Sequence, residues 1–350
     1  MKAVVFAGAG RVHVDDVPPP RIQGDHDALV AVSATSICGS DLHLLSGKTP
    51  AMRQGGIIGH EFVGTVSEVG DSVSAPAVGT RVVGSFLIAC GECLHCARRR
   101  FNHCVNRRAL GLGPTAGDLD GAQAEHVRVP HAGVNLHSLE GPFAELADGT
   151  ALFAGDILAT GFYAAHLADP SPGETVVVIG AGPVGLSTAL AARVREQVRV
   201  LVLDGDTRRV AFADRLGVEA VDVSKHDAQA IITERTDGTM ADATIEAVGA
   251  ADAFKSAMKC ARNGGRVVVV GVYGKERYAL PMGMTWIRGL DLRFSGMANV
   301  QNHWDETLAA LARGSIDTAP LITHRLPLDD AEEGYELFSS RKAMKVLLTP

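Results

Sequence analysis

The sequence predicts an α/β protein with two domains, a mostly β domain and a doubly wound parallel sheet. Its 350 residues are enough for two hydrophobic cores. Residues 176–179 form a continuous apolar run that leads into the G-x-G-x-x-G pattern at 180–185, and a helix-like segment follows. After this turn, apolar runs alternate with helix-like segments, whereas the N-terminal part has short β-like runs broken by Gly and Pro.

The N-terminal part lacks long stretches of helical periodicity, so we expect a compact, mostly β domain. The expected strands lie at 1–6, 28–32, 64–69, 81–83 and 125–129. Pro18-Pro19-Pro20 is interpreted as a rigid surface connection.

The second half alternates between the two kinds of element. We expect strands at 176–179, 198–203, 219–223, 242–248, 266–270 and 290–294, and helices at 206–217, 228–235 and 252–261. Such alternation predicts a doubly wound parallel sheet that binds its ligand at the carboxyl ends of the strands.

The glycine turn predicts a dinucleotide site. Gly180 permits a tight turn, Gly182 lets the backbone approach a pyrophosphate, and Gly185 allows close packing of helix on strand. The free N–H groups at the start of the helix suit phosphate. Asp204 ends the next apolar run, 19 residues after Gly185, where a carboxylate binds the ribose hydroxyl of NAD and repels the 2′-phosphate of NADP. The alternative is a strand–turn–helix without a ligand.

Four cysteines lie close together in the pattern Cys90-x2-Cys93-x2-Cys96-x7-Cys104. Four thiolates can close a tetrahedron around one zinc ion and leave no position for water. The spacing therefore predicts a structural zinc site that fixes a loop. The alternative is four free or disulfide-paired cysteines.

A second set of metal-type residues is dispersed. Cys38 and His60 offer a thiolate and an imidazole, which suit zinc, but two ligands do not make a site. A third ligand is expected from elsewhere in the chain. Taken alone, both residues also fit ordinary core and loop positions.

Composition narrows the class of protein. The formal net charge of -7 argues against electrostatic binding of nucleic acid. No apolar run reaches the 18 or so residues that a membrane span needs. Four of the six cysteines are clustered, which suits a metal in a reducing compartment, so we expect a cytoplasmic protein.

In combination these motifs resemble the zinc-dependent medium-chain dehydrogenase/reductase family, which contains the alcohol and polyol dehydrogenases. The resemblance covers essentially the whole chain. It rests on Cys38-Gly-x-Asp-x-His43, Gly59-His60-Glu61, the four-cysteine segment, the glycine turn and Asp204, all in the family's order. It implies a GroES-like catalytic domain of residues 1–157 and 297–350 and a Rossmann NAD-binding domain of residues 158–296.

The resemblance implies a third ligand of the catalytic zinc. Asp156 stands where liver-type alcohol dehydrogenases carry a cysteine, as in some bacterial alcohol dehydrogenases and the glutathione-independent formaldehyde dehydrogenases. Zinc accepts a carboxylate oxygen in a three-ligand site, so Cys38, His60 and Asp156 form the implied set. Glu61 matches a carboxylate that lies beside the metal or replaces water as an alternate ligand.

Three further residues match family positions with roles in the reaction. Ser40 stands where a hydroxyl bonds the substrate alcohol, and His43 stands where a histidine passes the proton to solvent. Thr160 matches a position near the nicotinamide.

The implied cofactor-binding residues are Gly180, Gly182, Pro183, Val184, Gly185, Asp204, Arg209, Val248, Gly271, Val272 and Lys345. For Lys345, a position near the pyrophosphate stands beside the alternative of an exposed lysine at a strand end.

The implied function is reversible, NAD-linked oxidation of a primary or secondary alcohol or a polyol, with two zinc ions per chain. One alternative is a glutathione-independent formaldehyde dehydrogenase or dismutase, and another is a non-catalytic NADH-binding protein. The partner is a small molecule, and the implied assembly is a homotetramer, with a dimer as the alternative. The sequence does not specify the substrate, whose surroundings are expected near Leu45, Phe86, Leu110 and Met297.

Overall fold

The computed structural model describes residues 1–47, 52–274 and 277–350, which divide into two compact units. Unit 1 comprises Met1–Ala159 and Met297–Pro350, and unit 2 comprises Thr160–Gly296. The first division lies two residues beyond the expected one after residue 157. The predicted α/β fold, with a mostly β domain and a doubly wound parallel sheet, is confirmed.

Unit 1 is built on a seven-stranded sheet with two small two-stranded sheets beside it. The large sheet has the order β16 (Ile322–Pro327), β17 (Lys345–Thr349), β3 (Ala28–Ile37), β4 (Phe62–Val69), β5 (Arg81–Gly84) and β9 (Leu136–Ser138), with β8 (His126–Val129) also paired to β3. The small sheets are β1 (Lys2–Phe6) with β2 (Val12–Asp16), and β6 (Leu87–Ile88) with β7 (Arg108–Ala109).

The register of β3 brings distant parts of the chain together. Within the antiparallel pairs, Thr35 stands opposite Phe62 of β4, and Ile37 stands opposite Val346 of β17. Continuing the same register places Glu61 beside Ser36 and Lys345 near the end of β3, where Cys38 follows. Strand β3 is longer than predicted, because residues 33–37 continue the buried strand between two neighbours.

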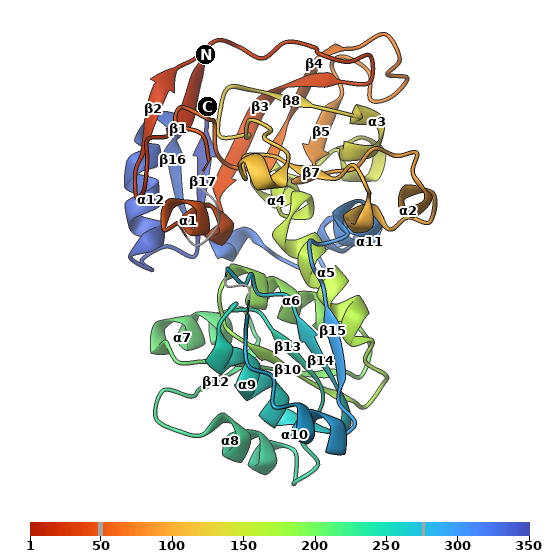
Figure 1. Ribbon diagram of the computed structural model, residues 1–350, viewed down its shortest axis with the longest axis vertical. Coiled ribbons are helices and arrows are strands. Elements are labelled where there is room, and N and C mark those ends of the chain that lie inside the picture. The colour runs from red at the N-terminus through yellow and green to blue at the C-terminus, as the bar shows by residue number, and fades with distance from the viewer. Residues whose placement is uncertain (48–51, 275–276) are drawn as a thin grey trace. The chain divides into compact units, whose positions relative to one another are not determined.

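The helices of unit 1 are mostly short. They are α1 (Gly39–Leu45), α2 (Leu94–Ala97), α3 (Ala132–Asn135), α4 (Asp148–Ala151), α11 (Val300–Ala312) and α12 (Ala331–Ser339), joined by single 3₁₀ turns such as η4 (Leu152–Gly155). Helix α12 lies beside the β1–β2 ribbon (Figure 1) and buries Tyr335 and Phe338 against Ile37 and Val346. The last helix and strand of the chain therefore share a core with its first residues.

Unit 2 contains six parallel strands. Their order is β12 (Glu219–Asp222), β11 (Arg199–Asp204), β10 (Thr175–Ile179), β13 (Ala241–Glu246), β14 (Ala261–Val269) and β15 (Asp291–Phe294). The helices are α5 (Ile157–Ala168), α6 (Pro183–Arg193), α7 (Thr207–Arg215), α8 (Ala228–Arg235), α9 (Ala251–Cys260) and α10 (Met282–Ile287). The strand order reverses between β10 and β13, which is where such sheets bind a ligand.

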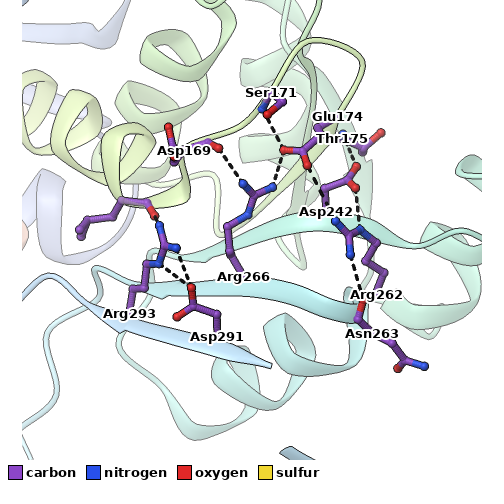
Figure 2. A network of polar contacts seen from close by, with 11 residues as sticks. Asp169, Ser171, Glu174, Thr175, Asp242, Arg262, Asn263, Arg266, Asp291 and Arg293 are labelled. Carbon is purple, nitrogen blue, oxygen red and sulfur yellow. Dashed lines mark hydrogen bonds and ion pairs between the residues drawn. The ribbon is translucent and has the colours of Figure 1, made fainter. Parts of the chain in front are cut away.

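Charged side chains close the opposite end of this sheet, where the strands begin (Figure 2). Arg266 donates to the carbonyl oxygen of Asp169, just beyond the end of α5, and to the carboxylate of Glu174. Arg293 donates to the carbonyl oxygen of Leu167 at 2.6 Å, and its guanidinium pairs with Asp291. The last carbonyls of a helix lack partners within the helix, so these arginines fix the C-terminal end of α5 to the sheet.

Among the described residues, no single helix is long and apolar enough to cross a membrane. One bent pair, Asp148–Gly155 with Ile157–Ala168, meets the length and composition requirements together, with an angle of 44° between the two parts.

Candidate active site

Four candidate metal ligands come together in unit 1 from three separate segments. Cys38 follows β3 and begins α1, His60 and Glu61 precede β4, and Asp156 lies between η4 and α5. One ligand atom from each residue lies within 4.8 Å of those of the other three, and all four residues are buried.

The distances within this cluster match a tetrahedral donor set. The Oδ2 atom of Asp156 lies 3.6 Å from Cys38 Sγ and 3.4 Å from His60 Nε2. Ligands bound tetrahedrally to zinc at ordinary lengths are about 3.3–3.8 Å apart. The three predicted ligands of the catalytic zinc are therefore in reach of one ion.

Glu61 is held at the edge of this cluster. One of its carboxylate oxygens, Oε2, accepts a hydrogen bond from Ser36 Oγ and contacts the ammonium group of Lys345. The other oxygen, Oε1, is buried and has no hydrogen-bond partner among the described residues. A buried acceptor without a partner is costly, and a cation beside it would satisfy it.

The charges of the cluster also fit a cation. Burial raises the pKa of the Cys38 thiol, and the charges of Asp156 and Glu61 raise it further. Burial opposes the charged form of His60, but the nearby carboxylates of Asp41 and Asp156 outweigh it and raise the pKa of His60. A divalent ion favours the thiolate and the neutral imidazole, which are the forms that bind zinc.

The predicted proton-handling residues lie on α1. Ser40 is half-buried, and its Oγ lies 3.1 Å from His60 Nε2, beside the candidate ligand atoms. His43 is three residues further along the same helix, and residues at this spacing share a helix face. Thr160 is buried in α5, one turn after Asp156.

Sequence reasoning missed the role of Asp41. Its Oδ2 accepts a hydrogen bond from the backbone N–H of Cys38 at 2.9 Å, and its Oδ1 lies 3.2 Å from His60 Nδ1. Metal-binding histidines commonly face a carboxylate with their second ring nitrogen, which orients the ring. The aspartate within Cys38-Gly-x-Asp-x-His43 was the available signal.

The four cysteines of the other predicted site form a second cluster. The Sγ atoms of Cys93 and Cys96 lie 3.6 Å apart, and those of Cys90 and Cys104 lie 3.5 Å apart. All are free thiols rather than disulfides. Backbone N–H groups, chiefly those of Cys96 and Val105, lower the pKa of Cys93 to about 6, whereas burial raises the pKa of Cys96 to about 12.

This four-cysteine lobe, residues 90–104, is attached to the start of α11. The Asn299 side chain accepts a hydrogen bond from the Phe101 backbone N–H at 3.0 Å and donates to the Arg99 carbonyl at 2.9 Å. Asn102 donates to the carbonyl of Met297. A metal in the lobe would therefore also order the segment where the chain re-enters unit 1.

Unit 2 places the glycine turn at the carboxyl end of β10. Gly180 has a positive φ of 104°, and a Cβ atom at Gly185 would lie 1.8 Å from the Gly180 carbonyl oxygen. Among the described residues, a Cβ at Gly182 would come within 4 Å of the Arg209 side chain alone, at 3.7 Å. Close helix packing explains Gly185, and the open space at Gly182 suits an approaching phosphate.

Asp204 lies at the end of β11 beside this turn. Its carboxylate accepts hydrogen bonds from the backbone N–H groups of Ala181, at 2.7 Å, and Asp206, at 2.8 Å. Arg209 approaches it at 3.9 Å, whereas Arg208 is bound by Asp206 through two side-chain contacts of 3.1 and 2.9 Å. That contact with Arg208 lowers the pKa of Asp206 to about 2.

A second feature missed from the sequence is Glu246, buried at the end of β13. Its Oε1 accepts hydrogen bonds from the backbone N–H groups of Val248 and Gly249, at 2.7 and 2.8 Å, and its Oε2 accepts one from the Tyr273 hydroxyl at 3.0 Å. This carboxylate joins the two loops that carry the expected cofactor residues. Val248 and Val272 are both about half exposed at these loops.

The structure corrects the placement of Lys345. The alternative of an exposed lysine at a strand end is wrong, because its side chain is 1% exposed and its ammonium group contacts Glu61. Strand β17 lies between β16 and β3, which draws this residue into the interior. Its assignment to the pyrophosphate stays a prediction that this contact does not support.

Of the residues expected around the substrate, Phe86 lies beside the candidate ligands. Its ring meets the His60 ring edge-on, with centroids 6.0 Å apart. Leu110, in contrast, is fully buried in the hydrophobic core with Phe62 and contributes to packing.

Two family models match the chain. The model described as the alcohol dehydrogenase GroES-like domain matches residues 24–139, and the model described as zinc-binding dehydrogenase matches residues 183–313. The four-cysteine lobe and the glycine turn lie at or within these matches.

Relatives and solved structures agree with the models. An uncharacterised zinc-type alcohol dehydrogenase-like protein of Bacillus subtilis (strain 168) is 33% identical over 380 aligned positions and is covered, like this chain, in full. The structure of alcohol dehydrogenase TADH from Thermus sp. ATN1 has a TM-score of 0.94 and 41% identity, covering 100% of this chain and 99% of its own. The structure of a candidate zinc-binding dehydrogenase from Sinorhizobium meliloti 1021, solved with NADP bound, has a TM-score of 0.86 and 30% identity. The match covers 100% of this chain and 99% of that chain. The chain belongs to the zinc-dependent medium-chain dehydrogenase family, among the zinc-type alcohol dehydrogenases.

Proposed function

We propose that this chain is a zinc-dependent, NAD-linked dehydrogenase that reversibly oxidises a primary or secondary alcohol, or a polyol, to the aldehyde or ketone. The observation that carries this proposal is the buried donor set of Cys38, His60 and Asp156, with Glu61 beside it. Three protein ligands and one further position are typical of catalytic zinc.

The residues around the donor set have distinct roles in this proposal. When bound, zinc supplies a Lewis acid that lowers the pKa of an alcohol, and the nicotinamide supplies a hydride acceptor. The Ser40 hydroxyl, beside His60, holds the proton of the substrate hydroxyl at its Oγ atom. His43, on the same helix face, takes this proton toward solvent. Phe86 contacts the His60 ring edge-on and adds an apolar group beside the donor set.

We propose two zinc ions per chain, one at each cluster. The Cys38→Ser variant is expected to retain one zinc ion, because the four-cysteine lobe is intact. The double variant Cys93→Ser/Cys96→Ser is expected to lose the lobe zinc and keep the other. The control is Cys260→Ala, which removes a buried thiol in unit 2 that belongs to neither cluster. Elemental analysis of the purified proteins gives the stoichiometry.

A folded lobe variant that loses both zinc ions would contradict the division into two independent sites. So would a wild-type chain that binds a single ion.

The activity itself is tested with a panel of primary and secondary alcohols and polyols, with NADH formation as the readout. Removing the thiolate in Cys38→Ser is expected to lower kcat/KM by about 10³-fold, because metal stabilisation of developing charge contributes several kcal/mol. Cys260→Ala is expected to keep wild-type turnover.

Two alternatives have their own outcomes in this assay. Formaldehyde turnover together with nicotinamide that is released only on denaturation would favour the formaldehyde dehydrogenase or dismutase. No turnover of any alcohol or aldehyde, with NADH still bound, would favour the non-catalytic NADH-binding protein.

The preference for NAD over NADP rests on Asp204. Its carboxylate repels a 2′-phosphate. Of the two arginines that could attract one, Arg208 is engaged by Asp206, and Arg209 lies 3.9 Å from the Asp204 carboxylate. Asp204→Asn keeps the size of the side chain and removes its charge. It is expected to shift the ratio of kcat/KM for NAD over that for NADP about tenfold toward NADP, equivalent to about 1.4 kcal/mol. The control Arg208→Gln is expected to leave the ratio unchanged, and a wild-type enzyme that prefers NADP would contradict the assignment.

We also propose that the chain self-associates, as a homotetramer or a dimer. Five apolar side chains on α10 and β15 are between 60% and 77% exposed: Met282, Met284, Trp286, Ile287 and Phe294. Large exposed apolar side chains on neighbouring elements are typical of an interface, and β15 is an edge strand of its sheet. The double variant Trp286→Ser/Phe294→Ser is expected to lower the mass measured by light scattering. A monomeric wild-type protein would contradict this proposal.

The free cysteines fit the reducing, cytoplasmic setting in which we propose that the enzyme works.

A further inference from the structure

A chain of buried polar side chains connects helix α12 with the candidate metal ligands of unit 1. The Tyr335 hydroxyl donates to Gln123 Oε1 at 2.9 Å. Gln123 Nε2 in turn donates to Asp41 Oδ2 at 3.3 Å, and Asp41 Oδ1 lies 3.2 Å from His60 Nδ1. All four side chains are buried. The hydrogen bond between Tyr335 and Gln123 in this series links residues that are more than 200 positions apart in the sequence.

At the centre of this series of side chains, the Gln123 amide uses its nitrogen and its oxygen in hydrogen bonds. Its amide nitrogen also donates to the carbonyl oxygen of Ser36, at the end of β3, at 2.9 Å. The amide thus gives both N–H groups to acceptors and takes one hydrogen bond at its oxygen. Burial raises the pKa of Tyr335 well above its ordinary value, with the Asp41 charge adding to the effect, so the phenol keeps its proton and donates it. The orientation of the amide is therefore fixed by its neighbours.

The Asp41 carboxylate contacts two candidate ligands, Cys38 and His60. The oxygen that accepts from Gln123 also accepts from the Cys38 backbone N–H at 2.9 Å. The other oxygen, Oδ1, lies 3.2 Å from His60 Nδ1, and neither of these two buried atoms has a hydrogen-bond partner in the described part of the chain. A rotation of the Asp41 carboxylate would disturb both the turn at Cys38 and the His60 ring.

The glycine of Gly59-His60-Glu61 is explained by the same contact. A Cβ atom at Gly59 would lie 2.3 Å from Gln123 Cγ and 2.6 Å from its Cδ. Gly59 also has a positive φ of 84°, which other residues rarely adopt. The Gln123 side chain therefore occupies the space that a side chain at position 59 would need.

We propose that Gln123, held by Tyr335, is a positioning residue of the metal centre: it fixes Asp41 and thereby sets the His60 ring and the Cys38 turn in the geometry that binds metal. Helix α12 is then coupled to the candidate ligands through Gln123 and Asp41. The proposal rests on the proposed function in one respect, since it requires a metal ion at the Cys38 cluster. Residues that orient metal ligands typically change metal affinity 10–100-fold when they are replaced.

The test uses two variants that preserve side-chain shape. Gln123→Glu places an acceptor where the amide nitrogen donates to Asp41 and Ser36, and it keeps the acceptor for Tyr335. Tyr335→Phe removes one oxygen atom and leaves the ring. Zinc affinity of the Cys38 cluster is measured in the full-length protein by competition with a chelator, and the phase that disappears in Cys38→Ser identifies this site.

We expect the affinity to fall about tenfold or more in Gln123→Glu and by a smaller factor in Tyr335→Phe. The absorption bands of the cobalt-substituted protein that depend on Cys38 are expected to shift in Gln123→Glu, because the ligand geometry changes. If Gln123→Glu does not fold, Tyr335→Phe carries the test.

Two controls separate positioning from stability. Phe338→Leu removes apolar packing from the same helix, and it is expected to lower Tm without changing zinc affinity or the cobalt bands. Tyr278→Phe removes the same oxygen atom from a tyrosine in unit 2 and is expected to change neither the zinc affinity nor the cobalt bands.

The failures are distinguishable. If Gln123→Glu and Tyr335→Phe lower Tm but keep the wild-type zinc affinity and cobalt bands, their role is structural and the proposal is wrong. A wild-type chain that binds zinc at the four-cysteine lobe alone contradicts the proposed function, and this proposal with it.

Discussion

Buried negative charge at the end of β3 is the constraint on which the rest of unit 1 depends. Cys38, Asp41, Glu61 and Asp156 are all buried there, and isolated carboxylates in a protein interior are very costly. Lys345 neutralises part of this charge, and its burial is possible only because Glu61 pairs with it. The remaining excess suits a divalent cation. A protein without such an ion would have little reason to keep these side chains together.

The topology of the sheet brings these charged residues together. Strands β4 and β17 flank β3, so the residues that precede Phe62 and Val346 arrive beside Cys38 from opposite sides. The chain must leave unit 1, form unit 2 and return to supply Lys345. The last helix, α12, adds Tyr335 to the same interior.

Much of the fold and part of the candidate site could be predicted from the sequence. The parallel strands of unit 2 follow from continuous apolar runs between helical segments. The G-x-G-x-x-G pattern after an apolar run predicts the tight turn at Gly180 and the close helix packing at Gly185. The four-cysteine cluster was equally accessible, because its ligands lie within 15 residues. Asp156 was reached only through the family resemblance, since nothing local distinguishes it from other loop aspartates.

What could not be predicted depends on contacts between distant segments. For Lys345, neither a position near the pyrophosphate nor an exposed strand end anticipated the buried contact with Glu61, because a short apolar strand carries no sign of what will cover it. Gln123 and Tyr335 have no motif, and their hydrogen bond joins residues far apart in the sequence. Glu246 has a local signal in the glycine three residues later, but its role appears only when the loops at the ends of β13 and β14 meet.

The most direct test of the central claim is a crystal structure of the zinc-loaded protein with anomalous diffraction measured at the zinc edge. The account predicts two peaks per chain. One lies among the four cysteines, and the other lies about 2.0–2.3 Å from Cys38 Sγ, His60 Nε2 and a carboxylate oxygen of Asp156. A single peak at the four-cysteine lobe, or a second peak away from Cys38 and His60, would contradict it.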